Sequence, residues 1–282
     1  MEDLEQRIAR VRDDREHGSR WLVRETISIL YDLASESTAT PDEQARRVWA
    51  AGQELTQARP AMAAITGAVR RILEAPGGRV GMVHEAARLR DEYDTAIARI
   101  TGYARPLLTG TLMTHSLSGT VQEVLLACAS QLERVIVLEG RPRYEGREVA
   151  RALSQHGIAV TLISDAQAAI FLPQCRAVVV GADSVMANGD LLNKAGTALL
   201  AWACQGYGIP FYVLCESLKI TPQTWTGDLA QLEEKEPQEV LAEPIPGVTV
   251  RNFYFDHTPA SLVTKFITEH GILEPHDVGL VP

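Results

Sequence analysis

An acid, an amide and an ammonium follow one short apolar run in the second half of the chain. The run AVVV (177–180) leads to Asp183, then to a turn at 188–190, and then to Asn193 and Lys194. Carboxylates exchange protons and hold sugar hydroxyls, whereas amides and cations hold phosphate. This set of groups predicts a site for a phosphorylated polyol at the end of a buried strand.

Further polar groups come shortly after other apolar runs. Arg141, Asp165 and Lys219 each occupy such a place, and the hydroxyl-rich stretch 114–120 leads into an apolar segment. That stretch is typical of a helix start, whose free N–H groups hold phosphate. Because ligands of open α/β sheets bind beyond the carboxyl ends of the strands, we expect these groups to gather at one sheet edge.

Each of these residues also has a purely structural interpretation. Asp183 is equally typical of a residue that caps a following turn, and Asp165 of one that caps a helix. A single lysine such as Lys194 is usually a solvated helix residue, and Arg141 fits a surface ion pair. The functional interpretation gains weight only because all these groups fall at the same predicted sheet edge.

The elements that must position these residues change character along the chain. Residues 1–105 have the three- and four-residue spacing of amphipathic helices, with a helix start at Thr40-Pro41. Beyond them, apolar runs alternate with amphipathic stretches, which predicts βαβ units and a mostly parallel sheet. The runs lie at 135–138, 160–163, 178–180 and 211–214, and the helical stretches near 145–156, 166–172 and 193–206.

The predicted fold is therefore α/β, with two domains. A helical N-terminal domain occupies residues 1–105, and a Rossmann-like domain with a mostly parallel sheet occupies residues 106–282. Residues 222–246, rich in Gln, Glu and Pro, are expected to form an exposed excursion before a final strand and helix.

Composition excludes several classes of protein. The chain has 282 residues, of which 46% are hydrophobic, and a net charge of −9, which disfavours nucleic-acid binding. Its 4 cysteines form no CxxC pair, and no apolar stretch is long enough for a membrane helix, so we expect a cytoplasmic protein. His115 lacks metal-ligand spacing and is interpreted as a structural hydrogen-bonder; no GxGxxG follows the first run, and we expect neither metal nor cofactor.

A family resemblance spans nearly the whole chain, with N-terminal counterparts at HGSRWLVRETI (17–27) and ARPAM (58–62) and five further stretches. The five are MTHSLSGTV (113–121), LEGRPRYEGRE (138–148), GADSVMANGDLLNKAGT (181–197), PFYVLCESLKI (210–220) and FDHTPASLVT (255–264). The chain resembles the superfamily that joins the alpha, beta and delta subunits of translation initiation factor 2B with sugar-phosphate isomerases. Ribose-1,5-bisphosphate isomerase and 5-methylthioribose-1-phosphate isomerase are among these enzymes.

The resemblance implies roles for particular residues. Asp183 corresponds to the catalytic acid/base of the isomerases, and a homodimer or higher homo-oligomer is expected. The positions linked to substrate binding are Asn193, Lys194, Arg141, Lys219, Gly18 and Arg20, of which Gly18 and Arg20 would close the pocket from the helical domain.

One position departs from the isomerase pattern. The isomerases carry a catalytic cysteine in a THCNS-like stretch, where this chain has Ser116 followed by Leu117. A serine hydroxyl is a much poorer proton donor than a thiol, although it still donates a hydrogen bond to an oxyanion. Two hypotheses remain: an aldose–ketose isomerase for a 1-phosphorylated pentose, with Asp183 and Ser116 catalytic, or a non-catalytic regulatory protein that binds a sugar phosphate or nucleotide.

Overall fold

The computed structural model describes residues 3–14, 19–36, 40–59, 62–232 and 234–280. The chain divides into two compact units, one of residues 1–96 and 218–221 and the other of the remaining residues. Helix α5 (Gly78–Ala104) runs across the division at residue 96, and the predicted domain limit at 105/106 follows its end. That limit stays a prediction.

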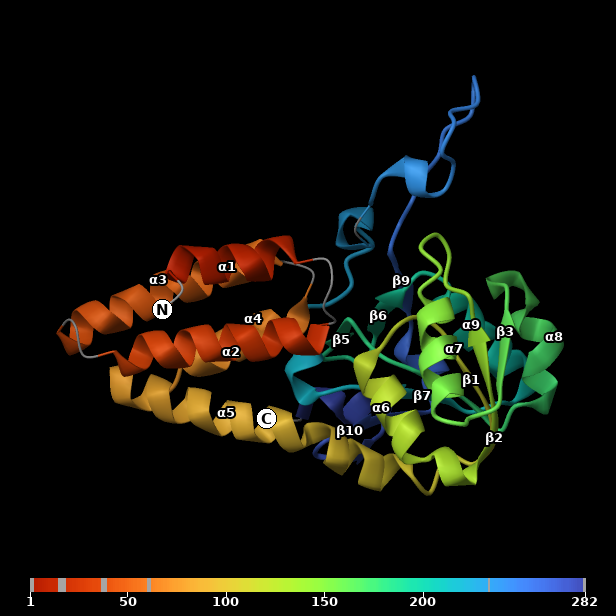
Figure 1. The fold of residues 1–282 in the computed structure, drawn as a ribbon, viewed down its shortest axis with the longest axis horizontal. Helices are drawn as coiled ribbons and strands as arrows, with labels where there is room; N and C mark the ends of the chain where they lie inside the picture. Colours follow the sequence, from red (N-terminus) through yellow and green to blue (C-terminus); the bar gives the residue numbers. More distant parts are fainter. Residues whose placement is uncertain (1–2, 15–18, 37–39, 60–61, 233, 281–282) are drawn as a thin grey trace. The chain divides into compact units, whose positions relative to one another are not determined.

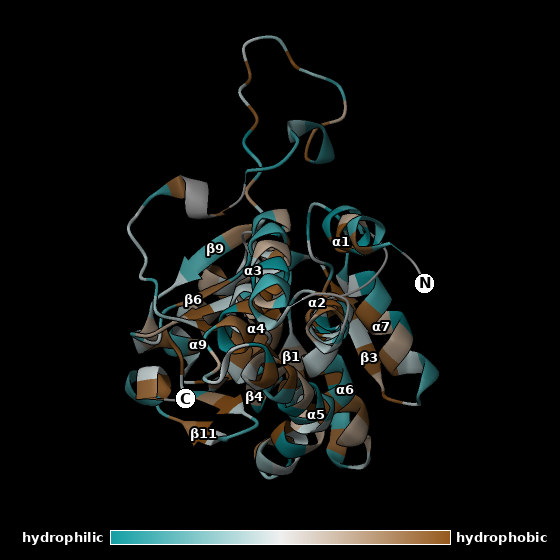
Figure 2. Ribbon diagram, turned by 90° about the vertical axis from the view of Figure 1, so that its left-hand side faces the viewer, coloured by the Kyte–Doolittle hydropathy of each residue, from teal (hydrophilic) through white to brown (hydrophobic). Residues whose placement is uncertain are grey.

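The first unit is helical, as predicted. Its elements are α1 (Leu4–Asp13), α2 (Ser19–Ser35), α3 (Pro41–Ala58), α4 (Ala63–Leu73), most of α5 and the short strand β8 (Ile220–Thr221). Hydrophobic and hydrophilic residues alternate along these helices in Figure 2, as expected of amphipathic helices. The apolar faces enclose a core that contains Ile27, Leu30, Leu55, Ile65 and Ile72.

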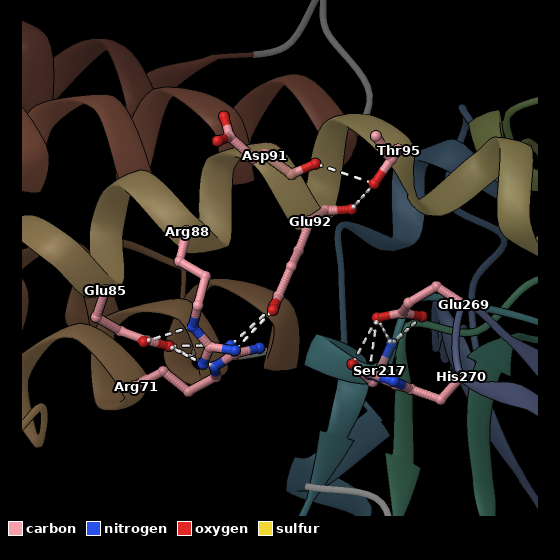
Figure 3. A network of polar contacts seen from close by, with 9 residues as sticks. All are labelled: Arg71, Glu85, Arg88, Asp91, Glu92, Thr95, Ser217, Glu269 and His270. Carbon is pink, nitrogen blue, oxygen red and sulfur yellow. Dashed lines mark hydrogen bonds and ion pairs between the residues drawn. The ribbon is translucent and has the colours of Figure 1, made fainter.

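A side-chain cap marks the start of α3, and ion pairs join α4 to α5. The Thr40 hydroxyl accepts a hydrogen bond from the Glu43 backbone N–H at 3.3 Å and so caps α3 at the predicted start. The Arg71 guanidinium on α4 donates to both Glu85 and Glu92 on α5, in each case at 2.9 Å (Figure 3). Ion pairs at the surface therefore tie α4 to α5.

The second unit is built around a seven-stranded sheet (Figure 1). Its strands, in spatial order, are β11 (Gly271–Leu273), β10 (Lys265–Thr268), β7 (Phe211–Leu214), β4 (Ala177–Val180), β1 (Gly110–Thr114), β2 (Leu132–Leu138) and β3 (Val160–Ile163). Neighbouring strands are parallel except β10 and β11. This is the strand order of the Rossmann fold with an additional antiparallel edge strand, so the predicted fold class is confirmed.

The α-helices of this unit are α6 (Gly119–Ala127), α7 (Gly146–Gln155), α8 (Ala168–Phe171) and α9 (Thr197–Tyr207). The sheet core beneath them contains Leu112, Val135, Val137, Val179 and Leu214. Strands that are buried on both faces read as continuous apolar runs, and this is why the sequence pattern located β2, β4 and β7. The edge strand β3 was also located by its apolar run, although its Leu162 is 45% exposed.

Two predicted helices need correction. The helix expected at 193–206 begins only at Thr197, because Asn193 and Lys194 end strand β6 (Leu191–Lys194). The helix expected near 166–172 is reduced to the short α8 between two 3₁₀ turns. Local propensity misplaced the first because pairing with the distant strand β9 decides the conformation at 191–194.

A smaller antiparallel sheet follows β4. It includes β5 (Ser184–Met186), β6 and β9 (Phe255–Thr258), with β6 between the other two. The predicted turn at 188–190 closes the β5–β6 hairpin, with Gly189 at φ +85° and Met186 N–H donating to the Asp190 carbonyl at 2.8 Å. A Cβ on Gly189 would lie 2.3 Å from the Pro275 carbonyl oxygen, so the turn requires glycine.

Within the predicted excursion at 222–246, residues 222–232 and 234–246 are mostly exposed and contain short 3₁₀ turns, as predicted (light blue in Figure 1). The prediction of one final strand and a helix after it is wrong: β9, β10 and β11 follow, and then a 3₁₀ turn at Pro275–Leu280. Every helix in the described ranges is too short or too polar to cross a lipid bilayer.

Candidate functional site

The carboxyl ends of β1 and β4 lie side by side in the middle of the large sheet. The strand order reverses at this point, with β2 and β3 on the β1 side and β7 and β10 on the β4 side. Such a switch point is where open α/β sheets bind ligands. Ser116 follows β1 and Asp183 follows β4, so both predicted catalytic residues lie at the switch point.

Ser116 has an unusual backbone conformation. Its φ of +70° is in the left-handed region, which residues other than glycine seldom adopt. The residue before it, His115, is buried, and its Nε2 lies 2.9 Å from the Ala195 carbonyl oxygen. Because the chain is fixed on both sides, by β1 and by the start of α6, the strained residue makes the turn between them and stays half-buried at the sheet edge.

The helix start predicted at 114–120 is the N-terminus of α6. Ser118 is its N-cap, and its hydroxyl accepts a hydrogen bond from the Val121 N–H at 3.4 Å. The Thr120 hydroxyl donates to the buried Glu216 carboxylate at 2.8 Å. A Cβ on Gly181, just after β4, would lie 2.5 Å from the Ser118 hydroxyl. The close approach of β4 to this cap therefore requires the glycine that precedes Asp183.

Asp183 connects β4 to β5. Its backbone N–H donates to the Leu192 carbonyl at 3.1 Å, and its side chain is half-buried. Strand β5 begins at the next residue, Ser184. Asp183 therefore precedes a strand and not the turn that the capping interpretation requires.

Lys194 is almost completely buried, with 3% of the residue exposed. Its Nζ lies 3.0 Å from a carboxylate oxygen of Glu145, in the loop after β2, and 4.5 Å from the centre of the Tyr254 ring. The interpretation of Lys194 as a solvated helix residue is thus wrong. Lysine is rarely buried without a charged partner, and a desolvated ammonium in a fixed position suits the binding of an anion or a hydroxyl oxygen.

Asn193 lies beside Lys194 at the end of β6. Its side-chain amide donates to the Thr197 hydroxyl at 3.0 Å, and that hydroxyl donates to the Lys194 carbonyl at 2.6 Å. These bonds shape the turn from β6 into α9. The structure thus brings Asn193 and Lys194 together and uses the Asn193 amide to hold the start of the helix.

A carboxylate that sequence reasoning missed holds the same helix start. Asp256 on β9 accepts hydrogen bonds from the Gly196 N–H at 2.7 Å and the Ala198 N–H at 3.1 Å. Burial raises the pKa of Asp256 to about 6, although both backbone bonds favour the charged form.

The loop after β2 carries Arg141 at the surface. Its backbone N–H and that of Gly140 donate to the Asp165 carboxylate at 2.8 and 2.9 Å. Asp165 therefore organises this loop, and the N-cap of the following turn is Ser164 instead. The Arg141 guanidinium lies 4.9 Å from the centre of the Tyr144 ring and donates to the Tyr144 hydroxyl.

Two other predicted binding residues, Arg20 and Lys219, belong to the helical unit. Arg20, on α2, donates to the Tyr93 carbonyl at 3.3 Å and lies 5.4 Å from the centre of the Tyr93 ring, within the helical unit. Lys219 is buried at the end of a 3₁₀ turn, in the segment that groups with the same unit. Gly18 lies outside the described residues.

Burial affects the protonation of His115 and of the cysteine thiols. Burial lowers the pKa of His115, so the imidazole is neutral and donates from Nε2 to the Ala195 carbonyl, in agreement with a structural role. All four cysteines are buried, and burial raises the pKa of Cys175 to about 11 and that of Cys204 to about 12. Neither thiol offers the reactive thiolate that Ser116 lacks.

No group of three or more metal-binding side chains gathers anywhere in the described part of the chain. Sequence reasoning did not single out Glu145, Tyr254 or Asp256, because each acts through a contact that spacing along the chain does not reveal. Glu145, for example, is separated from Lys194 by 49 positions. Glu145 and Asp256 do lie within the quoted stretches 138–148 and 255–264, and this was the signal that could have led to them.

Fold and site together define an α/β protein of the Rossmann type with a polar site at the switch point, preceded by a helical unit. The model of the Initiation factor 2 subunit family matches residues 15–275. The chain belongs to this family.

Relatives of both functional kinds are similar to the chain. Ribose 1,5-bisphosphate isomerase of Archaeoglobus fulgidus is 31% identical over 100% of this chain and 93% of its own length. Methylthioribose-1-phosphate isomerase of Geobacillus thermodenitrificans is 35% identical over 88% of this chain and 78% of its own. The crystal structure of translation initiation factor eIF-2B from Pyrococcus horikoshii superposes with a TM-score of 0.82 at 30% identity, covering 98% of both chains.

Proposed function

We propose that the protein is an aldose–ketose isomerase that acts on a 1-phosphorylated pentose, of the ribose-1,5-bisphosphate isomerase type. The observation that carries this proposal is that Ser116 and Asp183 follow the neighbouring parallel strands β1 and β4 at the switch point. Two relatives that match along most of the chain are named as isomerases of sugar 1-phosphates.

Asp183 is the proposed proton-transfer group. In the isomerisation the C1–O bond of the ring breaks and the ring oxygen gains a proton. A hydrogen moves from C2 to C1, and the C2 hydroxyl loses its proton as C2 becomes a carbonyl, so the formula is unchanged. A half-buried carboxylate at a strand end is well suited to take the hydroxyl proton as a general base.

Ser116 takes the place of the isomerase thiol in this proposal. Its hydroxyl donates a hydrogen bond to the oxygen that becomes negative when the ring opens. The left-handed backbone at Ser116, φ +70°, keeps this hydroxyl at the sheet edge rather than in a continuing strand. Without an acidic thiol, catalysis depends more strongly on Asp183.

The remaining residues bind the substrate in this proposal. Asn193 and Lys194 contact the sugar, Arg141 and Lys219 bind phosphate, and Gly18 and Arg20 contribute from the helical region, all on the resemblance to the isomerases. The backbone N–H groups at the start of α6 add to phosphate binding. Each role predicts a rise in KM when the side chain is removed.

The test is turnover followed by phosphorus NMR. Purified protein is incubated with ribose 1,5-bisphosphate, 5-methylthioribose 1-phosphate, 5-deoxyribose 1-phosphate and ribose 1-phosphate, and conversion of the anomeric phosphate to a ketose phosphate is measured. We expect turnover that falls at least about 10²-fold in Asp183→Asn, the usual minimum for loss of a general acid or base. Unchanged turnover in Asp183→Asn would contradict the assignment.

A second function is favoured by the residue after Ser116. Leu117 is 40% exposed and is apolar where the isomerases have a polar side chain. In this alternative the protein is a non-catalytic regulator that binds a sugar phosphate or a nucleotide. Turnover absent from the wild type but present in Ser116→Cys would support this alternative, because it would reveal an intact binding site without its acid.

Assembly and location complete the proposal. We propose a homodimer or higher homo-oligomer in the cytoplasm, with a small phosphorylated sugar as the ligand and no resident cofactor. Light scattering on the purified protein tests the assembly, and a purely monomeric mass would contradict it.

A further inference from the structure

One glutamate of the excursion (222–246) contacts the residues around Lys194. Glu239 lies at the end of a 3₁₀ turn, and its carboxylate accepts the Tyr254 hydroxyl, with oxygen–oxygen distances of 2.5 and 2.6 Å. The side-chain amide of Asn252, which is buried, donates to the same carboxylate at 3.0 Å and to the Glu236 carbonyl at 2.9 Å. The excursion is therefore fastened at Glu239 to the chain that leads into β9.

Tyr254 transmits this contact to the end of β6. Its carbonyl accepts the Ala195 N–H at 2.8 Å, and its ring lies 4.5 Å from the Lys194 Nζ. A cation over an aromatic face gains most when water is excluded, and Lys194 is buried. The hydroxyl of Tyr254 thus contacts the excursion and is also hydrogen-bonded to Arg143. Its ring contacts Lys194 and, at 5.6 Å, Lys235.

The Lys194 ammonium has two described contacts that set its place. The Glu145 carboxylate is 3.0 Å from Nζ, and the Tyr254 ring is the second contact. A lysine side chain has several rotatable bonds and holds no fixed geometry by itself. If the ring turns away, a single ion pair to Glu145 remains, and the ammonium gains freedom to move and to meet water.

The contact between Glu239 and Tyr254 persists across the physiological pH range. Burial and the hydrogen bond to Glu239 raise the pKa of Tyr254 to about 12, so the phenol remains a donor. Burial alone would raise the pKa of Glu239. Hydrogen bonds from Tyr254 and Asn252 nevertheless hold that pKa below its usual value, and the charges of Arg143 and Lys194 lower it further. The donor and the charged acceptor therefore coexist near neutral pH.

We propose that Glu239 is a positioning residue for the Lys194 ammonium and acts through Tyr254. The proposal rests on the proposed function only for what Lys194 then binds, namely a phosphate or hydroxyl oxygen of the sugar. Glu239 lies in the excursion, outside the stretches quoted for the family resemblance.

The test measures the reactivity of the Lys194 amine directly. The chain's lysines are Lys194, Lys219, Lys235 and Lys265. Trace acetylation of the intact protein, followed by proteolysis and mass spectrometry, gives a rate for each amine without any need for turnover. Lys265, which pairs with Glu274 in another part of the sheet, serves as the internal reference.

The variant Glu239→Gln keeps the size of the side chain and removes its charge. We expect the acetylation rate of Lys194, relative to Lys265, to rise about fivefold, as for loss of one cation–π contact. Glu145→Gln, the direct partner, should raise it further. The matched control is Glu243→Gln, since Glu243 is an exposed glutamate of the same excursion, and its rate should equal that of the wild type.

Two results would overturn the proposal. One is a Lys194 rate in Glu239→Gln within twofold of the wild type, and the other is an equal rise in Glu243→Gln. If the Lys265 rate also rises, the variant has unfolded, and Tyr254→Phe then decides, because it removes only the hydroxyl. In that variant an unchanged Lys194 rate would overturn the proposal and a several-fold rise would support it.

Turnover adds a separate reading. Where the wild type turns over, Glu239→Gln should raise KM about tenfold, the range for one charge-assisted contact, with kcat within about twofold. A changed Lys194 rate together with no turnover in the wild type would refute the isomerase but leave the positioning role standing. An unchanged Lys194 rate with normal turnover would refute the positioning role of Glu239 but leave the isomerase proposal standing.

Discussion

Charged side chains have different surroundings in the two units. In the helical unit, the Arg88–Glu92 pair is 2.7 Å apart, and its side chains are 58% and 30% exposed. In the α/β unit, the Lys194–Glu145 pair is 3.0 Å apart with side chains 4% and 26% exposed. The two contacts look alike by distance, yet only the second takes an ammonium out of water.

Carboxylates show the same contrast. Burial alone would raise the pKa of Glu85, but hydrogen bonds from Arg88 and Arg71 hold that pKa below its usual value. Burial raises the pKa of Asp256 to about 6, and its described hydrogen-bond donors are backbone N–H groups. The helical unit thus uses charge to join helices, whereas the α/β unit keeps costly charges at strand ends, where a polar ligand would meet them.

The largest effect on this contrast is expected from Lys194→Met. The variant leaves the Glu145 carboxylate partly buried without its cation, and breaking a buried pair from one side costs about 3 kcal/mol. Urea unfolding of the variant against the wild type measures the loss. Adding Glu145→Gln should recover part of it, because the unpaired charge is gone. A loss below about 1 kcal/mol would mean that the buried pair behaves like a surface pair.

The same contrast explains which parts of the fold were predictable from sequence. The predicted run at 211–214 coincides with β7, because strands covered on both faces are continuous apolar runs. The run at 160–163 coincides with the edge strand β3. Strand β6 was missed because it ends in Asn193 and Lys194, and only its pairing with β9 makes it a strand. Strand β1, with the sequence GTLMT, has little β-branched character and was missed as well.

Prediction of the site had the same limit. Strand-end reasoning predicted the location of Asp183, because the carboxyl ends of parallel strands meet at one edge. The contacts of Lys194 with Glu145 and Tyr254 join loops that only the tertiary structure brings together. A buried lysine and a solvated lysine look the same in a sequence, so the sequence could not predict the burial of Lys194.

The second effect concerns Asp256 and pH. Its pKa in the folded state, about 6, is above the value of about 3.9 for an unfolded chain, so the folded protein binds more protons between pH 4 and 6. Stability should therefore fall as the pH rises through this window. Because solvent screens part of the interaction, we expect Asp256 to contribute a fall of about 2 kcal/mol.

The measurement compares urea unfolding of the wild type and Asp256→Asn at pH 4, 5, 6 and 7. The asparagine does not titrate, so the stability of the wild type relative to the variant should decrease by about 2 kcal/mol from pH 4 to 7 and level off above pH 6. A difference that stays constant across the series would show that Asp256 titrates normally, like an exposed carboxylate.

The smallest effect is expected in the helical unit. Arg88→Met removes one cation from the Arg71–Glu85–Arg88–Glu92 network, and the other arginine still bonds both acids (Figure 3). The Arg88 side chain is 58% exposed, so the change in unfolding free energy should be below about 0.5 kcal/mol and should shrink further in high salt. Arg71→Met should cost more, because both arginines contact both glutamates but the Arg71 side chain is only 20% exposed. If Arg88→Met lowered the unfolding free energy as much as Lys194→Met, burial would not explain the difference between the charge pairs of the two units. The number of charge contacts would then have to set the cost.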